Sequence, residues 1–253
     1  MNKLALFAGI TLLSITGSVS AASIGSWIGS DRSWNNNGAF LSANELLTNQ
    51  GHTVDVDRAI SGNMHNYDVF LMGEPRSIPN PSEISELSNW ISEGGILLLM
   101  GDSNYATDYN PLVDRPWKDN LNIISASLGL SLRWGETVDT AGPFQGGNFA
   151  TEGKFNIVGE PLYTTPGAKV TGGTVLSENY LNFEALGLGT VFGFADRSDH
   201  IFFTDTINTP NSILLLNIAN GPVSNVPLPP ALWLFISGLL PIFLKRKAAI
   251  SLT

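Results

Sequence analysis

The stretch NPSEISELSNWISEGGILLLM, residues 80–100, decides the fold. Its first part predicts a helix, because Asn80 can cap the amino end, Pro81 suits the first helical position and Glu83 stands where a capping-box acid belongs. Apolar side chains then recur on one face of this helix, which is the pattern of a helix packed on a core. They are Ile84, Leu87, Trp90 and Ile91.

The second part of the same stretch predicts a buried strand. Gly94 and Gly95 end the helix, and residues 96–100 follow without a polar side chain. A five-residue apolar run directly after a helix is typical of a central strand that is buried on both faces.

The segments before this stretch extend the pattern. Residues 24–28 predict a strand, residues 40–47 a helix, and residues 52–56 and 67–72 two further strands. Strand, helix, strand, strand, helix, strand is the order of an open, mainly parallel α/β sheet with helices on both faces.

After residue 100 the pattern becomes richer in short strands. Residues 117–128 predict a helix and residues 130–134 a strand. Further β-like segments are residues 155–158, 169–176, 181–185, 190–195 and 201–204, and residues 211–220 predict a final helix. The fold class expected is therefore α/β with a β-rich C-terminal part.

Part of this pattern resembles a known superfamily. Residues 87–99, LSNWISEGGILLL, are similar to the helix, Gly-Gly turn and fourth strand of class I glutamine amidotransferase-like domains, which are flavodoxin-like. The resemblance covers residues 24–104. In catalytic members the loop after this strand carries a cysteine nucleophile, and this chain of 253 residues contains no cysteine. The resemblance therefore implies a non-catalytic member.

A serine-dependent hydrolase is the alternative reading of that loop. Ser103 stands near the nucleophile position, and His200 opens a late apolar strand where a base would fall. The sequence of residues 101–105, GDSNY, lacks the closing glycine of a Gly-x-Ser-x-Gly elbow. The other interpretation is a polar loop at the carboxyl end of a sheet and a histidine at the edge of a strand.

The same loop is a candidate ligand site, because ligands of open α/β sheets enter at the carboxyl ends of the strands. Its polar residues are Asp102, Ser103, Asn104 and Asp108. Their oxygen atoms are of the kind that Ca²⁺ prefers, although the spacing does not match an EF-hand. A solvated loop without a metal is the simpler interpretation, and we expect no other cofactor.

The amino end predicts export. The apolar run at residues 4–15, followed by small residues, indicates a secretory signal peptide at residues 1–21, with the Sec translocon and signal peptidase as partners. Val19 and Ala21 suit a cut after Ala21, and a cut after Ala22 is also possible.

The carboxyl end predicts a membrane segment. Residues 226–244 carry no charge and are close to the roughly 20 residues that cross a bilayer as a helix. The cations that follow suit the cytoplasmic side. The residues that define this segment are Val226, Pro227, Leu228, Pro229, Lys245, Arg246 and Lys247. An ordinary C-terminal anchor would have the same apolar run.

This tail also resembles the PEP-CTERM sorting signal of Gram-negative bacteria, which an exosortase is thought to cut. The expected organisation is a signal peptide at 1–21, an exported α/β domain at 23–221 and a linker at 222–225. The sorting signal follows at 226–247 and a cytoplasmic tail at 248–253. The resemblance implies a body that is periplasmic and anchored in the inner membrane, and that then reaches the cell surface or the extracellular space.

Charge restricts the partners of the body. The two ends carry four of the 13 lysines and arginines and no acid, so the body keeps 9 against 22 acids, a net charge of −13. So acidic a surface argues against nucleic acid. An extracellular polysaccharide or a surface protein is the expected partner, and exposed aromatic rings could stack on sugars. The rings considered are Trp27, Trp34, Tyr105 and Tyr109, which are otherwise core or loop aromatics.

Overall fold

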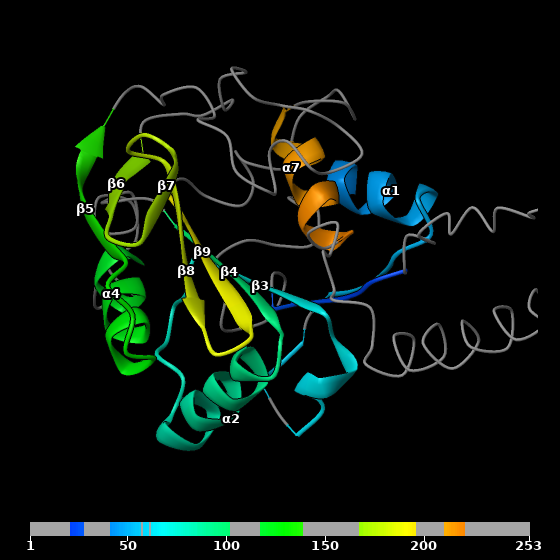
Figure 1. Ribbon diagram of the computed structural model, residues 1–253, viewed down its shortest axis with the longest axis horizontal. Coiled ribbons are helices and arrows are strands. Elements are labelled where there is room, and N and C mark those ends of the chain that lie inside the picture. The colour runs from blue at the N-terminus through cyan, green and yellow to red at the C-terminus, as the bar shows by residue number, and fades with distance from the viewer. Residues whose placement is uncertain are drawn as a thin grey trace, which may run out of the picture.

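The computed structural model describes seven segments of the chain (Figure 1). They are residues 21–27, 41–56, 58–60, 62–101, 117–138, 167–195 and 210–220. Residues 1–20 of the predicted signal peptide, the strands expected at 155–158 and 201–204, and the sorting signal at 226–247 lie outside the described residues. Within the described segments no helix has the length and apolar character needed to cross a bilayer.

A sheet of seven strands forms the centre of the molecule, in the order β2-β1-β3-β4-β9-β8-β7. The strands are β1 (Ser23–Ser26), β2 (Thr53–Asp55), β3 (Val69–Gly73), β4 (Ile96–Met100), β7 (Thr174–Ser177), β8 (Leu181–Leu186) and β9 (Gly189–Phe194). The first five strands of that order are parallel, and β8 and β7 are added antiparallel. The expectation of a mainly parallel α/β sheet with a β-rich C-terminal part is confirmed.

Helices cover both faces of this sheet. They are α1 (Leu41–Asn49), α2 (Pro81–Ser92), α4 (Trp117–Ser127) and α7 (Pro210–Ala219), with a short 3-10 helix η2 (Met64–Asn66). A separate two-stranded sheet consists of β5 (Arg133–Val138) and β6 (Gly167–Thr171). Helices α1 and α7 pack against each other, and Figure 1 shows them on the opposite side of the sheet from α2.

The strand register identifies the face under α2 and α4. Phe70 of β3 is aligned with Leu97 of β4, and its ring meets the indole of Trp90 on α2 edge-on, with ring centroids 6.5 Å apart. Side chains alternate along a strand, so Gly101 falls on the same face as Leu97. A methyl group built on Gly101 would lie 2.8 Å from Leu121 of α4. Both helices therefore pack on one face of the sheet.

Helix α2 begins as the sequence predicts. The Asn80 side-chain oxygen accepts hydrogen bonds from the backbone of Ser82 and Glu83, each at 3.0 Å. The Glu83 carboxylate accepts one from the Asn80 backbone at 2.7 Å, which completes the capping box. A cap of this kind contributes about 1 kcal/mol to stability.

The Gly-Gly turn after α2 has two separate causes. Gly94 has a φ of +123°, which only glycine adopts readily. At Gly95 a side chain would overlap the indole ring of Trp90. That indole is fixed in place because its Nε1 donates a hydrogen bond to the Tyr67 carbonyl at 2.9 Å. The turn thus permits both the change of direction and the close approach of the helix.

The strand predicted at residues 169–176 is wrong as one element. Gly172 and Gly173 divide it into β6 and β7, which belong to different sheets. Both glycines have positive φ, of +81° and +61°, and a side chain on either would meet backbone atoms of Ser131 or Phe183. The chain therefore turns at the Gly-Gly pair, inside the stretch that was predicted as one strand.

Candidate functional site

The site expected from the sheet topology lies between the carboxyl ends of β1 and β3. From β1 the chain proceeds to β2 on one side, and β3 and β4 follow on the other side. The carboxyl ends of the strands at such a switch point form the usual ligand crevice of an open α/β sheet. Ser26 and Trp27 stand at the end of β1, and Gly73 and Glu74 at the end of β3.

Glu74 is the most unusual residue at this edge. Its side chain is fully buried, although glutamate is almost never buried unless it is paired. Its φ is +40°, in the left-handed region that non-glycine residues rarely occupy. Such strain costs about 1–3 kcal/mol and persists only where the surroundings fix it, which is most often at functional sites.

The backbone on both sides of Glu74 is held by distant elements. The Glu74 amide donates to the Met100 carbonyl at the end of β4, at 2.9 Å. One residue earlier, the Gly73 carbonyl accepts from Trp27 Nε1 at 3.3 Å. One residue later, the Pro75 carbonyl accepts from Asn120 Nδ2 at 2.7 Å.

These three hydrogen bonds come from the segment after β1, from β4 and from α4. Two of them hold the same peptide unit, between Gly73 and Glu74, and the third holds the unit that follows Pro75. Together they hold the backbone on both sides of Glu74, whose φ is strained. The arrangement places a buried acidic residue at the edge where ligands of open α/β sheets bind.

Trp27 corrects one prediction from the sequence. It was expected among exposed rings that could stack on sugars, but its side chain is fully buried. Its amide donates to the Leu71 carbonyl at 3.2 Å, so the backbone continues alongside β3 beyond the end of β1. The ring is enclosed at the switch point. The other interpretation of Trp27, an aromatic residue of the core, is therefore correct. Trp34, Tyr105 and Tyr109 lie outside the described residues.

The other predicted site residues also lie outside the described residues. They are Asp102, Ser103, Asn104, Asp108 and His200. The residues that precede them are described, because β4 and β9 are neighbouring parallel strands in which Met100 is aligned with Phe194. Gly101 and Ala195 therefore lie directly after the ends of adjacent strands, at the same edge of the sheet as Glu74.

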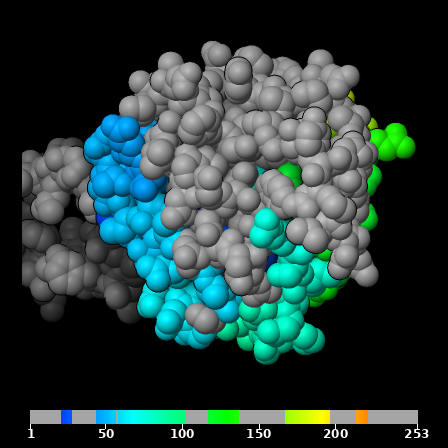
Figure 2. All heavy atoms as spheres, turned by 180° about the vertical axis from the view of Figure 1, so that it is seen from behind, coloured from blue at the N-terminus to red at the C-terminus, as the bar shows by residue number. Residues whose placement is uncertain are grey.

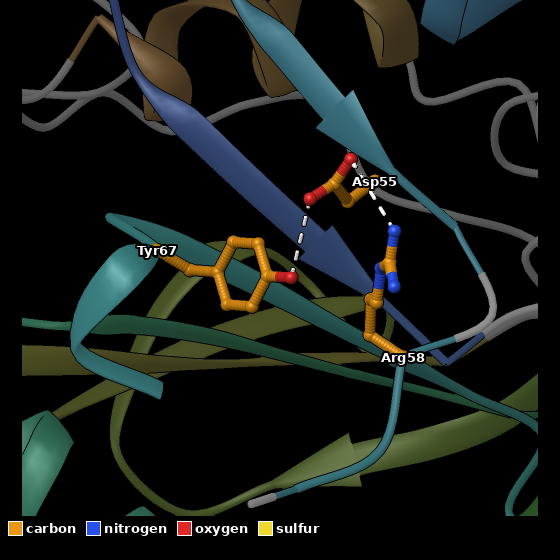
Figure 3. A network of polar contacts seen from close by, with 3 residues as sticks. All are labelled: Asp55, Arg58 and Tyr67. Carbon is orange, nitrogen blue, oxygen red and sulfur yellow. Dashed lines mark hydrogen bonds and ion pairs between the residues drawn. The ribbon is translucent and has the colours of Figure 1, made fainter. Parts of the chain in front are cut away.

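A second group of polar residues lies on the β2 side of the sheet (Figure 3). Tyr67 Oη donates to Asp55 Oδ2 at 3.3 Å, and Asp55 Oδ1 lies 3.7 Å from the Arg58 guanidinium. Burial and the nearby Asp55 carboxylate raise the pKa of Tyr67, so the phenol remains a hydrogen-bond donor at neutral pH. The Tyr67 ring lies over Gly25 of β1, where a methyl group would come within 2.9 Å of it. This network joins β2 to the start of β3 and has a structural role.

At the amino edge of the sheet a shallow depression of about 240 Å³ lies beside the end of α2. Its lining includes His65 and Glu93, whose Nδ1 and Oε2 atoms are 3.3 Å apart. In the space-filling view (Figure 2) the cyan surface of the segment from β2 to η2 lies beside the blue-green surface of α2. Among the described residues, no three histidines or carboxylates gather as a metal site would require.

Sequence reasoning did not single out Glu74. The available signal was a charged residue directly after a five-residue apolar strand and directly before a proline. That position is the carboxyl end of a strand in any parallel arrangement. Its place at the switch point, however, depends on which strands are neighbours.

Comparisons with known proteins identify the fold. No protein-family model matches the chain, and no curated protein matches its sequence. The solved structure of the mmIFT52 N-terminal domain is similar, with a TM-score of 0.58 and 11% identity over 81% of this chain and 100% of that domain. The cytoplasmic protein STM3548 from Salmonella typhimurium has a TM-score of 0.51 and 12% identity over 78% of this chain and 97% of that protein.

A beta-galactosidase from Rahnella sp. R3 also has a TM-score of 0.51, with 14% identity over 83% of this chain. The chain spans only 33% of the length of that enzyme. Likenesses at these identities establish a shared fold, and the function has to be argued from the site.

Proposed function

We propose that this protein is exported and that its body binds a ligand at the carboxyl edge of the sheet around Glu74, without catalysing a reaction. The observation that carries the proposal is the strained, buried Glu74 at the switch point, held by hydrogen bonds from three other segments.

The finer fold assignment belongs to the same proposal. The order β2-β1-β3-β4-β9 is the 2-1-3-4-5 order of flavodoxin-like sheets, in agreement with the resemblance to class I glutamine amidotransferase-like domains. The chain lacks the cysteine of the catalytic members. We therefore infer a member of that superfamily that binds rather than hydrolyses.

The proposed ligand is an extracellular polysaccharide or a protein of the cell surface. The oxygen atoms of a carboxyl group accept hydrogen bonds, which suits the hydroxyl groups of a sugar or the amides of a peptide. The net charge of −13 on the body disfavours nucleic acids and other strongly anionic partners.

Binding is tested with the body released from the envelope of a Gram-negative host that expresses the full chain. Glycan arrays and pull-downs from envelope extracts should give a ligand above background, and Glu74→Gln should weaken its binding by about tenfold or more. Glu45→Gln, at an exposed position on α1, is the matched control and should bind as the unchanged protein does. No ligand in either assay, or full binding by a folded Glu74→Gln protein, would refute the proposal.

Export and processing have their own test. Mass spectrometry of the protein from its native host should give a chain that has lost the signal peptide and residues 245–253. This outcome is expected because the tail resembles the PEP-CTERM signal that an exosortase cuts. A mature product that still carries Lys245 to Thr253 would leave only a plain membrane anchor.

A serine hydrolase is the second candidate function, and one observation favours it. Gly101 directly follows β4 and Ala195 directly follows β9, and these are adjacent parallel strands that end at one edge of the sheet. Ser103 and His200 come shortly after these two residues in the sequence. If Ser103 is a nucleophile with His200 as its base, a fluorophosphonate probe should label the protein, and Ser103→Ala or His200→Asn should abolish labelling. Absence of labelling in the folded protein would exclude this function.

A further inference from the structure

We propose that signal peptidase cuts after Ala21, and that His52 and Asp68 form a site that holds the new α-amino group of Ala22. This inference rests on the proposed export. It decides between the two cuts that the sequence allows, and it adds the groups that receive the new chain end.

Within the described residues, the side-chain exposure changes sharply between Ala21 and Ala22. Ala21 is exposed, whereas Ala22 is 5% exposed and packs in the hydrophobic core. The Ala22 carbonyl also accepts a hydrogen bond from the Thr53 amide at 3.0 Å, which extends the pairing of β1 with β2 by one residue. A cut after Ala22 would remove both contacts, and a cut after Ala21 keeps them.

His52 contacts the nitrogen that this cut would expose. The Ala22 nitrogen donates to His52 Nδ1 at 2.9 Å, and the imidazole is buried. A ring nitrogen accepts only when it carries no proton, so His52 has to be neutral with its proton on Nε2. Burial lowers the pKa of His52, although the neighbouring Asn220 side chain and the Asp68 charge oppose that shift. The lone pair of Nδ1 is therefore available near neutral pH.

Asp68 supplies a negative charge, which would be opposite to that of an α-ammonium group on Ala22. Its Oδ2 accepts from the Ser23 amide at 2.8 Å, and its own amide donates to the Ser23 carbonyl at 2.7 Å. The carboxylate is thus fixed one residue from the Ala22 nitrogen. An α-amino group has a pKa of about 7.7–8.0 and is mostly protonated at pH 7. A neutral imidazole acceptor with a carboxylate beside it is the chemistry that holds an ammonium group.

The competing cut has one point in its favour. It would place the ammonium group on Ser23, directly on the Asp68 carboxylate. It would leave His52 Nδ1 without the donor that occupies it and expose the core position of Ala22. Loss of a buried hydrogen bond and a buried methyl group together outweighs one exposed ion pair, which contributes little.

The test begins with the full chain expressed in a Gram-negative host and the product purified from its envelope. N-terminal sequencing and intact mass should give Ala22 as the first residue. An amine-specific acylating reagent near pH 7 should then modify the α-amino group at least about tenfold more slowly in the folded protein than in urea. His52→Leu should remove this protection, and His65→Leu, which changes the exposed histidine, should keep it. Asp68→Asn tests the same site if His52→Leu does not fold.

Each other outcome is decisive. A product that begins at Ser23 overturns the inference and leaves the proposed export intact. A product that begins at Met1 overturns both. An Ala22 terminus that reacts as fast in the folded protein as in urea shows that His52 and Asp68 do not hold it.

Discussion

Replacing Gly189 with alanine is expected to lower the free energy of unfolding by more than about 3 kcal/mol. Gly189 begins β9, and a methyl group there would overlap the carbonyl oxygens of Ile91 and Gly95. Neither oxygen can move freely, because that of Ile91 accepts from the Gly94 amide at 2.9 Å and that of Gly95 accepts from the Thr190 amide at 3.2 Å. The substitution must therefore displace the turn after α2 or the start of β9.

Urea denaturation of the purified protein measures this effect. Gly62→Ala is the matched control, because a methyl group on Gly62 would meet no atom within 4 Å. It should change the free energy of unfolding by less than about 1 kcal/mol. A Gly189→Ala protein as stable as the Gly62→Ala protein would contradict the close packing of the β8–β9 hairpin against the end of α2.

The elements that the sequence predicts correctly are those whose signals are local. Helix α2 carries its cap, its first-turn proline and its terminating glycines within one continuous stretch, and β4 follows as an uninterrupted apolar run. Helices α4 and α7 also agree closely with residues 117–128 and 211–220. In each case the residues that form the element also contain the evidence for it.

The division between β6 and β7 was missed, although the pair Gly172-Gly173 is itself a local turn signal. The pair alone does not reveal that β6 and β7 belong to different sheets, or that the two glycines lie close to the backbone of Ser131 and Phe183. Ser131 lies 41 residues before Gly172, whereas Phe183 lies 10 residues after Gly173. Only the tertiary structure brings their backbone against the two glycines.

The candidate site was harder to predict than the fold for the same reason. The burial of Trp27 depends on the strand beside β1, and the strained φ of Glu74 depends on Met100 and Asn120 from later elements. The loop after β4, which the sequence analysis favoured, remains a prediction. The strand that ends at Glu74 was recognised, but its neighbours at the switch point were not.

Replacing Trp27 with alanine is expected to cost about 3–5 kcal/mol of stability, because the ring is fully buried at the switch point. Trp27→Phe keeps most of the buried ring and removes the hydrogen bond from Nε1 to the Gly73 carbonyl. A bond of this kind contributes about 1 kcal/mol, and its loss should release the peptide unit before Glu74. Urea denaturation measures the first effect.

Hydrogen exchange of the Glu74 amide measures the second effect. That amide bonds to the Met100 carbonyl, so its exchange should accelerate when Gly73 is no longer held. Trp90→Phe is the matched control, since it removes an equivalent indole bond to the Tyr67 carbonyl on α2's face of the sheet. Both variants should lose similar stability, but only Trp27→Phe should accelerate exchange at Glu74 and weaken ligand binding. Equal exchange at Glu74 in the two proteins would mean that Trp27 stabilises the core without positioning the site.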